Sequence, residues 1–188
     1  ATTFCIDKIW LAQENALATD MASTTLITSN VTLSGTDQWS DYANSDPIDD
    51  IYTARTTIKG NTAVVPNVAV FGYQTWQKFI HHPDIIDRVK FVGVTGIGEI
   101  RKAIANLLEV DEVLVGDATK NTANQGVTDS LSYVWGKHFW LLHRAPRPGI
   151  MTPSFGYTVK DMDRQVDMYR DDARIGDVVR VRDSYDQV

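Results

Sequence analysis

Apolar residues recur at helical spacing in four parts of the chain. The first predicted helix covers residues 4–21. The second covers 47–59 and has the clearest limits, because Asp46 suits the N-cap, Pro47 suits the first helical position and Gly60 can end the helix. Its apolar face is narrow, so we expect this helix to lie on a sheet with its other side exposed. Two further helices are predicted, one after Gly72 that stops at Pro83 and one over 98–109.

Shorter apolar runs between turn residues predict strands. These runs are Val68–Phe71, Val113–Val115, Ser132–Leu142, Phe155–Val159, Gln165–Arg170 and Val178–Arg182. Residues 23–45 are polar with some apolar alternation and predict an extended arm, and residues 117–130 predict a polar loop. Two prolines make regular structure impossible over Ala145–Gly149, which we interpret as a crossing between two lobes. A few helices with scattered strands indicate an α+β fold.

The amino-acid composition excludes several classes of protein but does not identify one. The 188 residues are 43% hydrophobic, which suits one core or two small lobes and excludes a disordered tail. Lys and Arg total 18 and Asp and Glu total 24, so the net charge of −6 excludes a generally basic protein that wraps nucleic acid. No apolar run approaches the roughly 20 residues of a membrane helix. The single cysteine, Cys5, excludes an intrachain disulfide and a cysteine-based zinc finger.

Two motifs are candidates for chemistry, and both signals are weak. Gly93–Gly98 precedes a helix, so its amides could hold an anion in a small-molecule or peptide-binding module. His81, His82 and Asp84 could serve a metal-dependent hydrolase. Adjacent histidines on a helix point about 100° apart, however, so both bind one ion only with difficulty. We therefore predict a protein that is not an enzyme, without catalytic, cofactor-binding or metal residues.

The C-terminal part is rich in alternating charges. Five aspartates between Asp161 and Asp172 are interleaved with Arg164, Arg170 and Arg174. The calcium-binding EF-hand pattern is absent, and the basic neighbours favour ion pairs. Such pairs add little to folding but can set the register between subunits.

Several segments, in their order along the chain, together resemble the major capsid proteins of tailed bacteriophages. They are Gln38–Ile48, Pro66–Gly72 with Trp76, Phe79 and His82–Ile86, Ala105–Gly116, Asn121–Ala123 with Gly126 and Val134–Lys137, and Ala145–Gly149 with Pro153–Tyr157. The resemblance extends from about residue 38 to 160, and the flanking regions match by position alone.

The resemblance implies the tailed-phage capsid fold. In that fold a peripheral lobe carries a spine helix and a long sheet, and an axial lobe points at the capsomer axis. Mapped here, residues 1–60 are a peripheral segment with the spine helix at 46–60, residues 61–150 are mainly the axial lobe, and residues 151–188 return to the peripheral sheet. We expect a truncated body that lacks the N-terminal arm and most of the extended loop, and that cannot build a shell unaided.

The implied function is that of a structural subunit. It self-assembles into hexamers and pentamers of an icosahedral phage or prophage head that encloses double-stranded DNA without sequence-specific binding. The implied location is the virion capsid, and the host bacterial cytoplasm during assembly. Portal, scaffolding, protease and decoration proteins are the further partners that the resemblance implies, and no membrane is involved. A shell of the same fold around protein cargo is the rival within this class.

Charged and polar residues in adaptable or exposed segments are the candidates for assembly interfaces. They are Arg55, Asp117, Lys120, Asn121, Asn124, Arg144, Arg147, Arg180 and Arg182. Asp117–Asp129 is the polar loop expected at the axis, where one subunit must serve fivefold and sixfold positions. We expect charge reversal at the last four arginines to weaken capsomers more than it destabilises monomers.

Overall fold

The computed structural model describes residues 2–90, 96–147, 149, 151–173 and 175–188. The chain forms two compact units. One unit joins the two ends of the chain, Ala1–Met21 and Gly156–Val188, and the other is the continuous stretch Ala22–Phe155. Helices and strands occur in both units, which agrees with the predicted α+β class. None of the described helices is long and apolar enough to cross a membrane.

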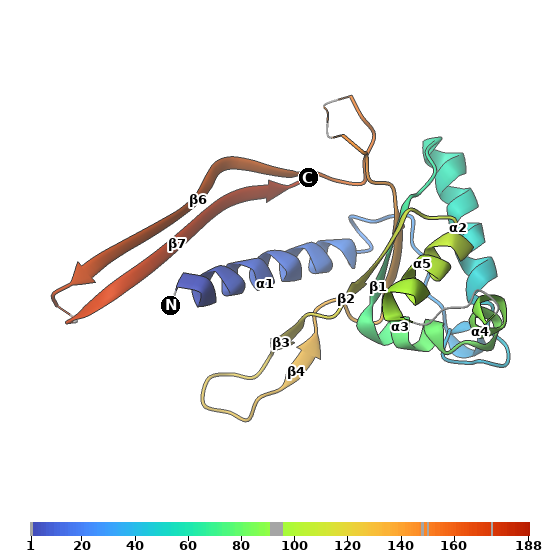
Figure 1. Cartoon of the computed structure of the whole chain (residues 1–188), viewed down its shortest axis with the longest axis horizontal. Coiled ribbons are helices and arrows are strands. Elements are labelled where there is room, and N and C mark those ends of the chain that lie inside the picture. The colour runs from blue at the N-terminus through green and yellow to red at the C-terminus, as the bar shows by residue number, and fades with distance from the viewer. Residues whose placement is uncertain (1, 91–95, 148, 150, 174) are drawn as a thin grey trace. The chain divides into compact units, whose positions relative to one another are not determined.

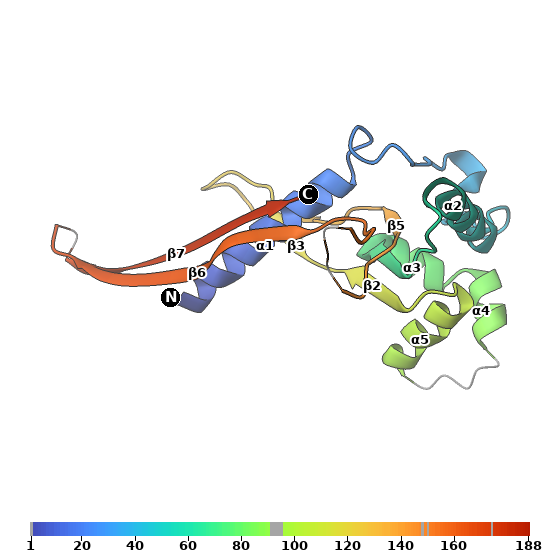
Figure 2. The same cartoon turned by 90° about the horizontal axis from the view of Figure 1, so that it is seen from above.

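The Ala22–Phe155 unit is built around a three-stranded sheet of order β2-β1-β5. Strand β1 (Val68–Gly72) is fully buried and pairs parallel with β2 (Glu112–Gly116) and antiparallel with β5 (Phe139–Leu142). A parallel pair needs a long crossover. Three helices supply it, namely α3 (Tyr73–Ile80), α4 (Pro83–Val89) and α5 (Ile97–Leu107). Figures 1 and 2 show these helices gathered beside the sheet.

One face of this sheet carries the core of the unit. Because side chains alternate along a strand, residues in register on the three strands share that face. They are Ala69 and Phe71, Val113 and Val115, and Phe139 and Leu141. Trp39 packs on them with its ring centroid 5.3 Å from Phe139 and 5.5 Å from Phe79. The predicted strands Val68–Phe71 and Val113–Val115 are therefore confirmed. The predicted run Ser132–Leu142 is not one strand, and Pro83, predicted to stop a helix, begins α4.

Helix α2 (Pro47–Thr62) begins as predicted and ends later. The Asp46 carboxylate accepts hydrogen bonds from the amides of Ile48 and Asp49, both at 3.1 Å, as an N-cap does. The predicted end at Gly60 is wrong. The helix continues to Thr62, and Ala63 takes the left-handed conformation with φ 58°, which replaces glycine as the residue that ends the helix.

Two predicted irregular segments have a defined structure. Part of the predicted loop 117–130 is strand β3 (Thr119–Asn121), which pairs in a short hairpin with β4 (Leu131–Tyr133) just after the loop. The predicted extended arm at 23–45 contains no strand among the described residues, and its regular element is the short 3-10 helix η1 (Gly35–Asp37).

Residues 144–154 form a closed loop, which we call the 144–154 loop. The Phe155 amide donates to the His143 carbonyl at 2.8 Å, and the Ala145 amide donates to Ser154 Oγ at 3.3 Å. These bonds bring both ends of the loop together within one unit. The chain leaves this compact unit after Phe155, and the predicted lobe crossing at Ala145–Gly149 stays a prediction. Pro148 lies outside the described residues.

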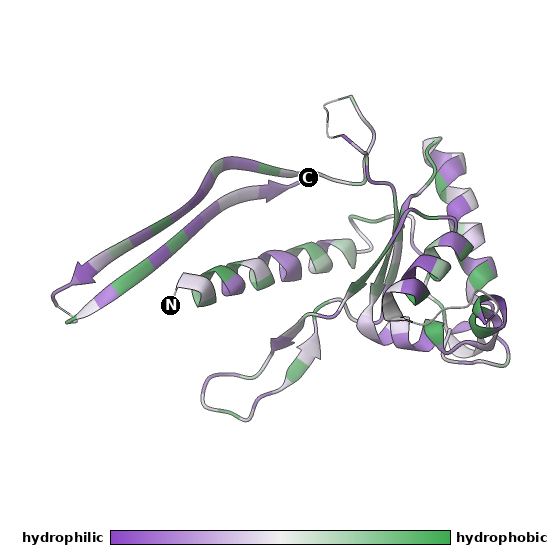
Figure 3. Cartoon of the chain, in the orientation of Figure 1, coloured by the Kyte–Doolittle hydropathy of each residue, from purple (hydrophilic) through white to green (hydrophobic). Residues whose placement is uncertain are grey.

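The other unit consists of a long helix and a long hairpin. Helix α1 (Thr2–Met21) contacts β7 (Gly176–Gln187), which pairs antiparallel with β6 (Thr158–Asp171). The strand predicted at Gln165–Arg170 is part of β6, which also includes the last two residues of the strand predicted at Phe155–Val159. Two register shifts interrupt β6 between Lys160 and Gln165. Apolar and polar residues alternate along this hairpin (Figure 3). The helix predicted as the spine, α2, belongs to the Ala22–Phe155 unit. The predicted lobe limits at residues 60 and 150 stay a prediction.

Candidate assembly surfaces and a buried polar centre

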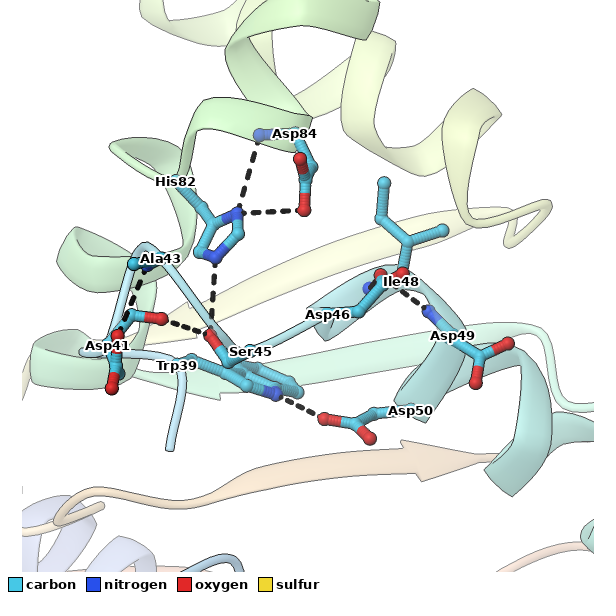
Figure 4. A network of polar contacts seen from close by, with 10 residues as sticks. All are labelled: Trp39, Asp41, Ala43, Ser45, Asp46, Ile48, Asp49, Asp50, His82 and Asp84. Carbon is cyan, nitrogen blue, oxygen red and sulfur yellow. Dashed lines mark hydrogen bonds and ion pairs between the residues drawn. The ribbon is translucent and has the colours of Figure 1, made fainter. Parts of the chain in front are cut away.

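A buried histidine connects the segment before α2 to the start of α4 (Figure 4). The His82 residue is 1% exposed, and its Nδ1 accepts a hydrogen bond from the Asp84 amide at 3.4 Å, which caps α4. Its Nε2 lies 3.2 Å from Ser45 Oγ, and Nδ1 also lies 3.4 Å from an Asp84 carboxylate oxygen. The Ser45 hydroxyl in turn donates to the Asp41 carbonyl at 2.7 Å. The centre is therefore a closed chain of satisfied polar groups.

This centre does not supply the chemistry of the rival hydrolase. The Ser45 hydroxyl donates its proton to the Asp41 carbonyl, so that proton is not directed at the imidazole as a nucleophile–base pair requires. His81 is exposed while His82 is buried, and the two do not face one site. Across the part of the chain that the structure describes, no group of three or more His, Cys, Asp or Glu residues could hold a metal ion. Residues 93–95 of the predicted anion loop lie outside that part.

The Asp41 side chain stiffens the turn before this centre. Its carboxylate accepts from the Asn44 side-chain amide at 3.0 Å and from the Ala43 backbone amide at 3.1 Å. These hydrogen bonds, that of Asn44 first, lower the pKa of Asp41. The turn delivers Ser45, which is 8% exposed, to His82.

Arg55, a predicted interface residue, makes its contacts inside its own unit. Its Nη1 donates to the Leu108 carbonyl at 2.9 Å and lies 2.9 Å from a carboxylate oxygen of Glu109. The Tyr52 hydroxyl donates to the Leu107 carbonyl at 2.8 Å from the same helix. The two side chains tie α2 to the C-terminal end of α5, where positive charge is favourable. Arg55 thus has a structural role in the monomer.

The β3–β4 hairpin holds three of the predicted interface residues, and a fourth, Asp117, lies just before it. The Asn121 side chain donates to Asp129 at 2.7 Å and accepts from the amides of Ala123 and Ser130, both at 3.0 Å. Asp117 and Asn124 are exposed, and Lys120 is half-buried. The hairpin also exposes two apolar residues, Val127 at 65% and Leu131 at 72%. Asn121 therefore braces a loop whose apolar tip faces solvent.

Arg144 and Arg147 lie in the 144–154 loop. Arg144 pairs with Glu112 at 2.7 Å, and its backbone is held by Asn67, which accepts from the Arg144 amide at 2.7 Å. Arg147 is exposed. The same loop exposes 94% of Met151. The Arg147 and Met151 residues of this loop are therefore both exposed to solvent.

The last two predicted residues lie on the hairpin of the terminal unit. Arg180 pairs with Asp167 across the two strands at 3.0 Å, and Arg182 lies 4.0 Å from the same carboxylate. The register confirms that both arginines share one face of the strand. Arg174, which we expected in the same charge pattern, lies outside the described residues.

Sequence reasoning missed the residue that joins α1 to the hairpin. The Asp183 side chain is 2% exposed, and its Oδ2 accepts from Arg164 at 2.8 Å and from Gln13 of α1 at 3.1 Å. The Arg164 hydrogen bonds lower the pKa of the Asp183 carboxyl, and Gln13 and Lys160 act in the same direction. Arg164 also lies over the Trp10 ring of α1, 5.1 Å from its centroid. Asp183 lies two and four residues after Val181 and Val179, so all three share one strand face. A carboxylate on an otherwise apolar strand face was the signal that could have identified it.

Known proteins match both the sequence and the structure. A model of the family described as phage major capsid protein E matches residues 25–118, half of the 188-residue chain. The major capsid protein of Pseudomonas phage JBD67 is 36% identical over 115 residues, and that of Burkholderia phage BcepMu is 26% identical over 123 residues. The alignments cover 60% and 63% of this chain, but only 35% and 38% of those proteins.

The fold has a solved counterpart over nearly all of the chain. A phage-related protein from Bordetella bronchiseptica RB50 superposes with a TM-score of 0.83 at 27% identity. The match covers 99% of this chain and 61% of that one. The expected resemblance is therefore confirmed. Since the family match includes α2, β1, β2 and the helices between them, it rests on the core of one compact unit. The chain belongs to the phage major capsid protein E family.

Proposed function

We propose that this chain is a structural, non-enzymatic subunit of a phage or prophage head. It associates with further copies of itself into hexamers and pentamers, and the resulting icosahedral shell encloses double-stranded DNA. The match of the capsid family to half of the chain carries this proposal. The location that follows is the virion capsid, with assembly in the bacterial cytoplasm.

The two compact units suggest revised lobes. A long helix against a long two-stranded sheet is the arrangement expected of a peripheral lobe, and α1 with β6 and β7 has it. We therefore assign Ala1–Met21 with Gly156–Val188 to the peripheral lobe and Ala22–Phe155 to the axial lobe. In this assignment α1 replaces residues 46–60 as the spine helix.

Exposed apolar surface supports self-association. An isolated two-stranded hairpin is marginally stable in water, and the terminal unit buries only Ala18 and Met21 among its described apolar residues. Its exposed large apolar residues include Phe4, Met168 and Ile175. Patches of this kind mark surfaces that a partner covers. In a symmetric shell the natural partner is another copy.

Charge is consistent with a shell around DNA. A net charge of −6 limits adhesion of the genome to the protein, so the DNA would be held without sequence-specific contacts. Portal, scaffolding, protease and decoration proteins are the further partners that we propose.

Electron microscopy and light scattering test the proposal. We expect the 188-residue chain to form discrete oligomers, and the longest gene product that carries it to form shells, tubes or rings. A monomer at all concentrations, with and without the neighbouring phage proteins, would contradict a capsid role. Nuclease-protected DNA in the shells separates a phage head from a compartment with protein cargo. Metal analysis of the purified chain separates both from the hydrolase.

A further inference from the structure

The four methionines of the chain differ widely in exposure. Met21 of α1 is 6% exposed, whereas Met162 and Met168 of β6 are 53% and 69% exposed and Met151 is 94% exposed. Methionine is usually a core residue, because its thioether side chain is apolar and fills irregular spaces. A thioether that solvent reaches is open to oxidation to the sulfoxide. The two methionines of β6 lie on a paired strand, so the fold itself holds them in exposed positions.

Met168 lies on the apolar face of the β6–β7 hairpin. It pairs with Val179 across the two strands, and directly opposed residues share a face. Val166 and Val181 form the next pair on the same face. A polar group introduced at Met168 would therefore interrupt a continuous apolar surface.

Helix α1 lies over the β7 side of this face and leaves the β6 side open. Asp183 is four residues beyond Val179 and faces the same way, and its carboxylate accepts from Gln13 of α1 at 3.1 Å. On β6, in contrast, Val166 is 45% exposed and Met168 is 69% exposed. The Met168 sulfur is thus accessible to a small oxidant dissolved in water.

We propose that the Met168 sulfur is a site of oxidation by peroxides, and that the resulting sulfoxide weakens the association of copies of this chain. The second part rests on the proposed self-association. Hydrogen peroxide transfers one oxygen atom to the sulfur, so an S–O bond forms, the O–O bond breaks and water is released. The thioether is oxidised by two electrons and the peroxide is reduced by two. The sulfoxide is polar, so the apolar face loses part of its tendency to be buried.

Met162 is a control within the same strand. It pairs with Ser184, which directly follows Asp183, so Met162 faces away from the apolar side of the hairpin. Because it is 53% exposed, Met162 should be oxidised as well, but without an effect on association. Met21 should stay reduced as long as its surroundings stay folded, since it is only 6% exposed.

Titration with hydrogen peroxide, followed by mass spectrometry of peptides, tests the modification. The Cys5→Ser background is used throughout, because the single thiol also reacts with peroxide. In dilute protein we expect one added oxygen atom at Met168 and at Met162 before any at Met21. In concentrated, associated protein Met168 should be protected while Met162 is not. Oxidation of Met168 no faster than that of Met21 would overturn the proposal.

Substitutions separate the modification from its effect. Met168→Leu keeps the size and apolar character but forms no sulfoxide, so its association should equal that of the unoxidised parent and should withstand peroxide. Met168→Gln is polar like the sulfoxide, and analytical ultracentrifugation should show association weakened about 10- to 100-fold because apolar burial is lost. Met162→Gln is the matched control and should associate normally. Both sites are exposed, so the two glutamine variants should have the same Tm.

The outcomes distinguish this inference from the proposed function. Self-association that is unchanged after Met168 has been oxidised would refute the inference and leave the capsid role standing. Peroxide that dissociates Met168→Leu as readily as the parent would place the sensitive group elsewhere and would also refute it. A chain that stays monomeric at all concentrations would contradict both proposals.

Discussion

Removal of the His82 side chain should destabilise the Ala22–Phe155 unit severely. In His82→Ala three favourable terms are lost. The N-cap acceptor for Asp84 contributes about 1 kcal/mol, and the hydrogen bond to Ser45 contributes about 1 kcal/mol. The vacated ring, 1% exposed in a packed interior, adds about 1–2 kcal/mol for the cavity. We therefore expect the free energy of unfolding to fall by about 3–4 kcal/mol.

Equilibrium unfolding in urea, followed by tryptophan fluorescence, measures this loss. Trp39 lies in the same core and provides the signal. With an m-value of about 2 kcal/mol/M, the midpoint should fall by about 1.5–2 M. His82→Asn retains a capping acceptor and should recover about 1 kcal/mol.

His81→Ala is the matched control, because the neighbouring histidine is exposed. It should change stability by no more than about 0.5 kcal/mol. The reasoning is refuted if His82→Ala unfolds at the wild-type midpoint, or if the two alanine variants are equally destabilised. Equal loss of a bound metal in both variants would instead revive the hydrolase.

Three further predictions concern other parts of the chain. Asp183→Asn should loosen α1 from the hairpin at neutral pH. Because the pKa of Asp183 is lowered from its ordinary 3.8, the wild type should lose this stabilisation only as the pH falls through that lowered pKa. Hydrogen exchange of the α1 amides across pH 2–7 measures the loss. Gly116→Ala should lower the free energy of unfolding by about 1–3 kcal/mol, measured by thermal unfolding, because its new methyl group would collide with the Trp135 ring. Gly60→Ala is the control: open space surrounds this position, so the change should be neutral or stabilising. Arg144→Glu should lower monomer stability by no more than about 1 kcal/mol, since its pair with Glu112 is exposed, and light scattering should reveal a larger loss if the residue also contacts another copy.

Local signals were sufficient to predict the elements of the continuous unit. Asp46 and Pro47 mark the start of α2 because capping depends on adjacent residues. The apolar run of β1 identifies the central strand because that strand is buried on both faces. The end of α2 was missed because a helix can include a glycine at a cost of about 1 kcal/mol, and Ala63 adopts the left-handed conformation in its place.

Contacts between distant residues could not be predicted in the same way. Gln13 and Asp183 are 170 positions apart, and no local pattern indicates that they meet. Strand β6 was divided because charged residues interrupt its apolar alternation, and only the pairing with β7 shows that Asp167 is held by Arg180. The interface candidates were chosen by charge, but Arg55 and Arg144 satisfy that charge within the chain.

The joining of the two chain ends in one unit sets an order of folding during synthesis. Residues 22–155 separate α1 from the hairpin, so at about 5–20 residues per second the ribosome needs on the order of ten seconds to deliver the strands that α1 requires. All residues of the continuous unit have been synthesised by then. The surface that α1 and β7 form together does not exist until the hairpin has docked, so a nascent chain lacks that surface until translation has passed the hairpin.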